Sequence, residues 1–232
     1  MAELDLAEVN QRLESAEPPQ ILEWAWQQFA PRIAATSSFQ SQSLPLLHMI
    51  TRVTPEMPVF FLDTGFHFQE TLEFRDRLMA EWGLRVQNLS AEMGHVAFGR
   101  QYGQLHNTNP DLCCFINKVE PLRLAKAGLD AWITGIRRDQ TDTRRDATIV
   151  SLERDGAYKI CPMLNWTKQD VWRYINRHEL PVHPLLSQGY MSIGCAPCTR
   201  PIVDGEDERS GRWAGTNKTE CGLHLDSTPK KG

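Results

Sequence analysis

The amino-acid sequence predicts an α/β protein with a doubly wound parallel sheet. Short apolar runs with the length of buried strands alternate along the chain with longer segments of helical periodicity. The clearest runs span residues 32–36, 58–62 and 130–136, and each leads into a polar or charged loop. The 232 residues, 41% of them hydrophobic, are enough for one domain with a sizeable core. We expect that domain to cover residues 1–200, followed by a flexible tail over 201–232 with little apolar periodicity.

The first half of the chain predicts a pair of helices and then alternating strands and helices. Two amphipathic helices between residues 4 and 30 are separated by Pro18 and Pro19. Pro45 fits the first turn of a later helix, where its missing N–H is tolerated. Gly83 is expected to cap the helix before it, since glycine readily adopts the left-handed conformation of a C-cap. In order, the predicted elements are helices within 4–30, a strand at 32–36, a helix from 44, a strand at 58–62, a helix over 68–82 and a strand near 84–86.

The second half of the chain is less regular. Residues 90–111 give no clear pattern. Asp155 and Gly156 form a turn signal between two short strand-like runs. Thr167 is expected to N-cap the last helix, because its hydroxyl can accept a backbone N–H. The predicted elements are a strand at 130–136, a strand pair at 148–152 and 158–160, and a helix from 168 to about 178.

Three polar loops follow predicted strands, and they begin at Ser37, Asp63 and Arg137. Since ligands of such sheets bind beyond the carboxyl ends of the strands, we expect these loops to gather at one edge. The serine-rich loop over 37–43 precedes a helix, a setting that favours an anion, although an ordinary N-cap has the same composition. The turn after Leu62 can offer backbone groups to an adenine edge, or it is a plain turn and helix cap. The chain has neither a dinucleotide-binding fingerprint nor a Walker phosphate loop.

The third of these loops carries four arginines within residues 137–145. Guanidinium groups can bind phosphate or sulfate through forked hydrogen bonds. A solvated helix face with aspartate partners is the alternative interpretation. The position directly after a buried strand favours anion binding.

Four of the six cysteines form two pairs, Cys113 with Cys114 and Cys195 with Cys198. In a reducing compartment such pairs more often bind metal or act in catalysis than form disulfides. Zinc and an iron–sulfur cluster both accept four thiolates, and two unconnected pairs of buried cysteines are the third possibility. The missing spacer in the first pair favours a cluster, which is several ångströms across, over one small ion. Lys118 follows Cys114 by about one helical turn, and its positive charge would suit an anionic cluster.

Cys221 lies in a charged, glycine-rich tail, apart from the other cysteines. Arg209, Arg212 and Lys218 precede it, and nearby cations favour the reactive thiolate. The same cations could hold an anionic substrate. A disordered tail with a chance cysteine is the alternative, and Cys161 is expected to be a small buried residue. One reactive thiol beside four fixed ones indicates redox or sulfur chemistry.

The overall composition excludes several classes of protein. The formal net charge of −4 gives no general attraction to nucleic acid. There is no apolar run after a basic N-terminal start, and no stretch of about 18 apolar residues that could span a bilayer. We therefore expect a cytoplasmic protein that works without a membrane or nucleic acid. The oligomeric state stays open, with a homo-oligomer as one option.

Taken together, these motifs resemble the iron–sulfur-containing adenylyl-sulfate (APS) reductase branch of the assimilatory sulfonucleotide reductases. The resemblance runs from about residue 32 to residue 224. The paired cysteines and the segment around Cys221 are highly specific, whereas the loops are weak individually. The segments that carry the resemblance are 37–43, 62–65, 113–122, 134–140, 194–201, 211–213 and 220–224.

The resemblance implies an adenine-nucleotide α-hydrolase-like fold and a [4Fe–4S] cluster. It also implies that Cys221 attacks the sulfur of adenosine 5′-phosphosulfate, that AMP leaves, and that thioredoxin reduces the resulting thiosulfonate to free sulfite. It places adenine near Leu62 and the serine loop, and the phosphosulfate near basic side chains. The substrate-binding residues that it implies are Ser37, Ser38, Phe39, Ser41, Ser43, Leu62, Lys118, Gly135, Arg144, Arg209 and Arg212, and the cluster ligands are Cys113, Cys114, Cys195 and Cys198.

Two departures from related patterns bear on this interpretation. The serine loop lacks the acid of the S-G-G-x-D-S loop in ATP pyrophosphatases of this fold, so we do not expect ATP cleavage with magnesium. The segment between Arg212 and Cys221 is short for the family, which leaves the reach of Cys221 open. The nearest alternative is a 3′-phosphoadenylyl-sulfate (PAPS) reductase, or an enzyme that uses both substrates. More distant alternatives are an ATP-dependent tRNA thiolase and a zinc-stabilised nucleotide-binding module.

Overall fold

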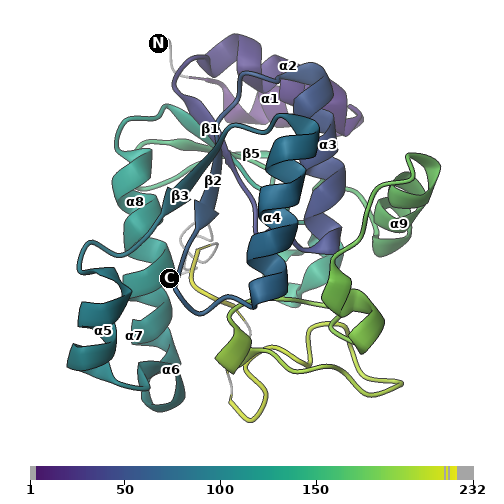
Figure 1. Ribbon diagram of the computed structural model, residues 1–232. Helices are drawn as coiled ribbons and strands as arrows, with labels where there is room; N and C mark the ends of the chain where they lie inside the picture. Colours follow the sequence, from purple (N-terminus) through teal and green to yellow (C-terminus); the bar gives the residue numbers. More distant parts are fainter. Residues whose placement is uncertain (1–3, 217, 219, 224–232) are drawn as a thin grey trace.

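A computed structural model describes residues 4–216, 218 and 220–223 of the chain, and they build an α/β fold around one sheet. The strands of this part of the chain lie in the order β3-β2-β1-β4-β6-β5 (Figure 1). Neighbouring strands run parallel, except that β5 pairs antiparallel with β6 at the edge. The predicted fold class is confirmed, with an antiparallel edge strand added. The strands are β1 (Ile33–Thr36), β2 (Val59–Leu62), β3 (Val86–Leu89), β4 (Ala131–Ile133), β5 (Val150–Leu152) and β6 (Tyr158–Ile160).

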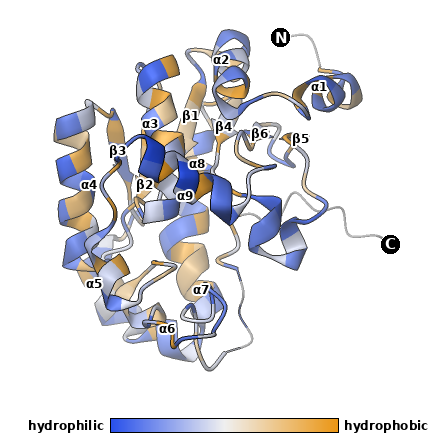
Figure 2. Cartoon of the chain, turned by 90° about the vertical axis from the view of Figure 1, so that its right-hand side faces the viewer, coloured by the Kyte–Doolittle hydropathy of each residue, from blue (hydrophilic) through white to orange (hydrophobic). Residues whose placement is uncertain are grey.

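The two faces of the sheet bury different cores, because successive side chains of a strand point to opposite faces. In β1, Ile33 and Ala35 belong to the larger core and Ala34 to the smaller one. Helices α1, α2, α3, α4 and α9 supply the larger core, and α8 covers the smaller one (Figure 1). Figure 2 shows hydrophobic residues concentrated in the strands and on the inward helix faces. These helices are α1 (Leu6–Leu13), α2 (Pro18–Phe29), α3 (Leu44–Val53), α4 (Gln69–Trp82), α8 (Glu120–Lys126) and α9 (Lys168–Arg177).

Local sequence signals place most of these boundaries. The proline pair begins α2, Gly83 ends α4 with a left-handed φ of 66°, and Thr167 caps α9 through its hydroxyl. The strand predicted near 84–86 exists, but its bounds are shifted: β3 begins at Val86 and runs to Leu89, and Leu84 is a buried residue that precedes it. The strand predicted over 130–136 is too long, because the chain beyond Ile133 leaves the sheet to line a pocket.

The segment that the sequence left unassigned forms three short helices, α5 (Gly94–Tyr102), α6 (Leu105–Thr108) and α7 (Pro110–Cys114). They pack around a small third core that includes Phe98, Leu105 and Cys113. A π-helical turn, Phe115–Val119, then leads directly into α8. Such turns insert one extra residue into a helix and are frequent at functional sites.

The tail after residue 200 returns to the carboxyl ends of the strands (Figure 1). Its first part is tied to the domain, since Thr199 forms a bridge with Arg212 and the Trp213 amide donates to the Cys198 carbonyl over 2.9 Å. Trp213 is buried, and Leu223 packs against the smaller core. The expected flexibility of residues 201–232 concerns motion and stays a prediction. In the described part of the chain, no helix has the length and apolar character needed to cross a bilayer.

Candidate active site at the strand ends

A pocket opens at the carboxyl ends of β1, β2 and β4, and side chains of the tail line one of its walls. The loops after Thr36 and Ile133 contribute to it as expected for a parallel sheet. The loop after β2 contributes Leu62 and His67, whereas Asp63 lies outside the lining. The residues singled out in the sequence that line the pocket are Ser37, Ser38, Ser43, Leu62, Lys118, Gly135, Arg144, Arg209, Arg212 and Cys221.

Two residues of the serine loop do not lie along this pocket. Phe39 has a φ of 55°, which turns its side chain into the core against Phe61, with ring centroids 5.7 Å apart. Ser41 is buried, and its hydroxyl accepts the backbone N–H of His183 over 3.1 Å. The resemblance implied substrate contacts for both residues, but the left-handed backbone of Phe39 redirects this part of the loop. The expected substrate contacts of these two side chains are therefore not supported by their positions.

His67 lines the pocket although the sequence gave no separate signal for it. Its Nε2 donates to the Leu62 carbonyl over 2.8 Å, and its ring lies 4.7 Å from that of Phe61. Burial lowers the pKa of His67, so the neutral ring with a proton on Nε2 is favoured. The bond fixes the end of β2 where the chain enters the pocket.

Lys118 and Arg212 bring positive charge to the same wall of the pocket. Lys118 projects from the π-helical turn and is buried. Burial alone would lower its pKa, but Coulombic interactions with the sulfur atoms of Cys195, Cys221 and Cys114 outweigh burial and raise it. The Arg212 guanidinium lies 4.5 Å from the Trp213 ring centroid and donates to the Ile193 carbonyl over 3.2 Å. Lys118 is therefore held as a cation beside the thiols.

Glu220 is the second pocket residue that sequence reasoning did not single out. Its buried carboxylate accepts from Arg144 over 2.8 Å and lies 3.5 Å from Arg209. The Thr141 hydroxyl donates to its other oxygen over 3.3 Å. The sequence showed Glu220 as the neighbour of Cys221, but nothing in the local pattern predicted its arginine partners.

The four paired cysteines line a second, smaller cavity next to the pocket. Cys113 and Cys114 end α7, while Cys195 and Cys198 flank a short 3₁₀ turn. Burial first, and then the charges of the other three thiols, raise the pKa of Cys113 to about 11. Burial would also raise the pKa of Cys195, but Lys118 and a 3.3 Å contact with the Thr64 hydroxyl lower it. Two pairs distant in sequence thus form one electrostatically linked set.

The donor set of this cavity is sulfur-rich and incompletely satisfied. Asn117 Oδ1 and His106 Nδ1 are buried there without a hydrogen-bond partner among the described residues. Within the same part of the chain, no three His, Cys, Asp or Glu side chains converge closely enough to hold a single metal ion. The residues available to a larger sulfur-ligated group are Cys113, Cys114, Cys195 and Cys198.

Cys221 lies in the pocket itself, with its thiol partly exposed. The left-handed Gly222, at φ 92°, turns the chain beside Val119, and Leu223 anchors the segment on the smaller core. The short segment after Arg212 is therefore long enough to bring Cys221 to the cations. His224, the last residue of the segment 220–224 that contains Cys221, lies outside the described residues.

Residues 32–201 match the model of the phosphoadenosine phosphosulfate reductase domain family. A protein of Halalkalibacterium halodurans named adenosine 5′-phosphosulfate reductase is 40% identical over 225 residues, covering 96% of this chain and 97% of the relative. One of the same name from Mesorhizobium japonicum is 48% identical and covers 85% and 78%. A Gloeobacter violaceus protein named phosphoadenosine 5′-phosphosulfate reductase is 43% identical and covers 94% and 93%.

Solved structures with similar folds agree with the family match. The phosphoadenylyl-sulfate reductase of Candida auris, in a phosphate complex, aligns with a TM-score of 0.75 at 28% identity, over 85% of this chain and 98% of that one. An FMN adenylyltransferase of Candida glabrata aligns with a TM-score of 0.60 at 16% identity, over 87% and 69%. The second likeness concerns the fold alone.

Proposed function

The chain belongs to the phosphoadenosine phosphosulfate reductase family, and we propose that it reduces adenosine 5′-phosphosulfate (APS) with Cys221 as the attacking thiol. Its closely similar relatives over nearly the whole chain include APS reductases, and the chain is an oxidoreductase of assimilatory sulfate reduction. The observation that carries the assignment of Cys221 is its position. It shares one pocket with four cationic side chains and with the nucleotide-facing loops of the sheet.

The substrate anion would bind among Lys118, Arg144, Arg209 and Arg212. Arg144 Nε and Arg212 Nε are buried without a hydrogen-bond partner in the described part of the chain. A buried, unsatisfied guanidinium N–H is costly, and a phosphate or sulfonate oxygen would satisfy it. Adenine and ribose would then lie toward Ser37, Ser38, Ser43, Leu62 and Gly135, at the ends of the strands.

In the first step, the Cys221 thiolate attacks the sulfur of APS. A sulfur–sulfur bond forms, the bond from that sulfur to the phosphate oxygen breaks, and AMP leaves with the electron pair. Both partners are anionic, so their approach needs the surrounding cations, which also stabilise the charge that develops on the phosphate. Lys118 is suited to this role, because it carries its charge between the pocket and the thiols. The product on the enzyme is a Cys221 S-sulfonate.

In the second step, a dithiol reductant of the thioredoxin class releases the sulfite. One of its thiolates attacks Cys221 Sγ, sulfite leaves, and the second thiol resolves the mixed disulfide. The two electrons come from the dithiol, which becomes a disulfide, and Cys221 returns as a thiol. Reduced thioredoxin is a cytosolic reductant, and this step therefore assigns the protein to the cytoplasm.

We further propose that Cys113, Cys114, Cys195 and Cys198 hold a [4Fe–4S] cluster. The four thiols line one cavity and interact electrostatically, and two buried polar atoms beside them have no hydrogen-bond partner in the part of the chain that the structure describes. Buried thiols with raised pKa values are poor isolated thiolates, and iron ligation would stabilise the deprotonated form. When bound, the group would supply an anionic, sulfur-rich neighbour whose charge Lys118 balances.

PAPS reduction is the second candidate activity. The 43% identical Gloeobacter violaceus relative carries that name, so identity at this level accompanies either substrate. APS is favoured because most of the similar relatives of comparable coverage are named for it.

The test compares sulfite release from APS and PAPS by anaerobically purified protein with thioredoxin. We expect sulfite from APS, and a brown protein with iron bound. Cys221→Ser should abolish sulfite formation and keep the brown colour, whereas Cys195→Ser should lose both. Equal rates with the two substrates would indicate dual specificity. An intact brown protein that makes no sulfite from either substrate would refute the proposed activity, and normal turnover by the iron-free Cys195→Ser protein would refute the ligand assignment.

A further inference from the structure

Glu220 occupies a position that the reaction chemistry alone does not explain. It is an acid inside a pocket for an anionic substrate, and it directly precedes the attacking Cys221. Its carboxylate is almost fully buried, with 4% of the side chain exposed, and Arg144 is 8% exposed. Removing one partner of such a buried pair is strongly destabilising, because it leaves an uncompensated charge in the protein.

Arg144 is committed to this contact by its other neighbours as well. Nη1 of Arg144 donates to the Gln140 side chain, and Nη2 donates to Glu220. The Thr141 hydroxyl, from the same loop, donates to the carboxylate. The loop over 138–144 therefore forms a fixed receptor for the acid, whereas Arg209 lies farther away, at 3.5 Å.

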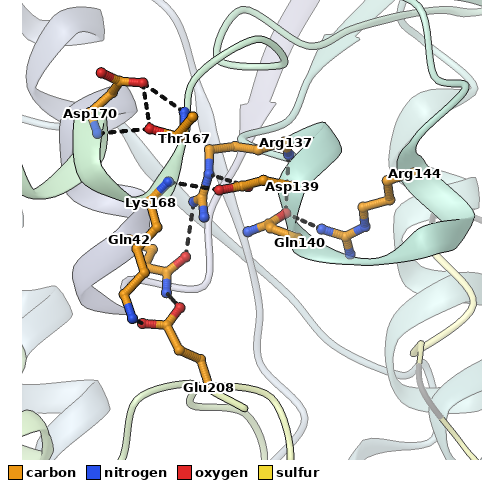
Figure 3. Close-up of polar contacts among 9 residues, drawn as sticks. All are labelled: Gln42, Arg137, Asp139, Gln140, Arg144, Thr167, Lys168, Asp170 and Glu208. Carbon is orange, nitrogen blue, oxygen red and sulfur yellow. Dashed lines mark hydrogen bonds and ion pairs between the residues drawn. The ribbon is translucent and has the colours of Figure 1, made fainter.

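The earlier part of the tail is anchored by separate contacts. Figure 3 shows the carboxylate of Glu208 meeting Gln42 and Lys168, at 2.9 and 2.6 Å. Gln42 also accepts from Arg137 over 2.9 Å, and Arg137 pairs with Asp139 (Figure 3). This network holds the residue before Arg209, and it does not involve Glu220. The chain is thus secured at residue 208, and Glu220 is an independent attachment next to Cys221.

We propose that Glu220 is a positioning residue that holds the Cys221 thiol in the pocket through its ion pair with Arg144. The proposal rests on the assigned role of Cys221 in APS reduction. It also gives Arg144 a second function beside substrate binding. Its Nη2 holds Glu220 of the tail, while its Nε, which has no hydrogen-bond partner among the described residues, stays available to the substrate anion. Breaking the pair lets the segment around Cys221 leave the pocket, as contact with a dithiol protein requires.

The first experiment measures S-sulfonation of Cys221 in a single turnover with APS and no reductant. Glu220→Gln, which keeps the shape of the side chain, should slow this step about 10- to 100-fold, since small misplacements of reacting groups cost rates of that order. Arg144→Gln should slow it similarly, and the double variant should be no slower than the slower single variant. Glu220→Asp should recover part of the rate. Glu206→Gln is the matched control, because Glu206 pairs with Arg200 on the same tail outside the pocket.

The second experiment measures binding of APS to the same variants in a Cys221→Ser background. Glu220→Gln should bind APS as tightly as the parent or more tightly, because it frees Arg144 and removes a negative charge. A slower reaction with undiminished binding separates positioning from general damage to the pocket. If Glu220→Gln itself weakens APS binding, Glu220 shapes the substrate site and the positioning role is wrong. An unchanged S-sulfonation rate in Glu220→Gln would also overturn it.

A third measurement does not depend on APS. Alkylation of Cys221 by iodoacetamide, followed by mass spectrometry of the tail peptide, reports how well the thiol is held in the pocket. The reaction should be faster in Glu220→Gln and in Arg144→Gln, without further increase in the double variant. If the wild-type protein makes no S-sulfonate from APS, the proposed activity fails while this arm still tests the ion pair. Equal alkylation rates in all variants would refute the positioning role.

Discussion

At the scale of single residues, Arg212 depends on a neighbour that has no side chain. A Cβ at Gly194 would fall on the Arg212 guanidinium, whereas a Cβ at Gly211 would fall on the backbone carbonyl oxygen of Arg200. The guanidinium is the far end of a flexible side chain and can move aside, but the backbone cannot. Alanine at Gly194 should therefore affect substrate binding, whereas alanine at Gly211 should affect the stability of the fold.

We expect Gly194→Ala to raise the KM for APS about tenfold, because it displaces Arg212, a cation that we propose binds the substrate by charge-assisted hydrogen bonds. Its thermal midpoint and iron content should match those of the wild type. Gly211→Ala should instead lower the thermal midpoint, since the clash is with backbone. Steady-state kinetics and differential scanning calorimetry on both variants make the comparison. A normal KM in Gly194→Ala would mean that Arg212 does not contact the substrate.

Residues with distinctive side-chain chemistry were easier to assign to the candidate site from the sequence than residues whose placement depends on the backbone or on distant partners. The paired cysteines, Cys221 and the tail arginines were recognisable because thiol and guanidinium chemistry is rare and specific. Phe39 and Ser41 were misplaced, because a positive φ at one residue redirects the loop and leaves no mark in composition. Glu220 was overlooked because its place in the pocket depends on an ion pair with Arg144, which lies 76 residues away in the chain.

At the scale of elements, the edge strand β5 is completed by a side chain from helix α1. Asn10 Nδ2 donates to the Val150 carbonyl over 2.8 Å, and the Val150 amide donates to Asn10 Oδ1 over 2.9 Å. The amide group thus imitates a neighbouring strand at a position where Val150 is buried. Unpaired edge groups otherwise invite pairing with another chain.

Asn10→Ala should lower the free energy of unfolding by about 2 kcal/mol, because it leaves two buried backbone groups unpaired. The urea midpoint should fall with an unchanged m-value, while kcat stays at its wild-type value. Gln11→Ala, on the exposed side of the same helix, is the control. Equal midpoints for the two variants would show that solvent satisfies the Val150 groups.

The elements that the sequence predicted poorly are short ones that depend on each other. Helices α2, α3, α4 and α9 follow from periodicity and from caps such as Gly83 and Thr167. Helices α5 to α7 have 9, 4 and 5 residues, too few for periodicity to be decisive. The π-helical turn was unpredictable for a related reason, since the extra residue matters only through how Lys118 meets the thiols.

At the scale of the whole molecule, His183 connects three segments that are distant in sequence, namely helix α4, the serine loop after β1 and the 3₁₀ turn that begins at Pro184. It is completely buried, its Nδ1 accepts the Leu185 amide over 3.2 Å, and its Nε2 bonds to the Thr71 hydroxyl over 3.0 Å. Its backbone amide donates to Ser41. Burial lowers the pKa of His183 to about 4, and only Glu70 acts in the opposite direction. Protonation would break the bond that Nδ1 accepts.

The stability of the whole chain should therefore fall as the pH drops from about 6.5 to about 4, the unfolded and folded pKa values of His183. In this range the unfolded state binds the proton and the folded state does not, so stability is complete above pH 6.5. The full loss corresponds to about 3 kcal/mol. Urea titrations across this range should give a shallower dependence for His183→Gln than for the wild type. Identical slopes would mean that the His183 ring titrates normally in the fold.

The overall architecture was largely predictable, because a parallel sheet places the ends of its strands, and hence their loops, at one edge. The antiparallel partner of β6 followed from the turn at Asp155 and Gly156. The joining of Cys113 and Cys114 with Cys195 and Cys198 could be inferred only by matching chemistry, since no local signal brings the pairs together.

The order of these parts along the chain has a consequence for synthesis on the ribosome. The loops proposed to face the nucleotide are translated first, the second cysteine pair follows much later, and Cys221 comes after both. A nascent chain can therefore form most of the sheet before the proposed nucleophile has been synthesised. Since Glu220 is made immediately before Cys221, the proposed anchor and the thiol leave the ribosome together. With Cys221 as the attacking thiol that we propose, a chain whose translation stalls at residue 219 forms no S-sulfonate from a reactive sulfate donor, although it already contains the cation-rich pocket.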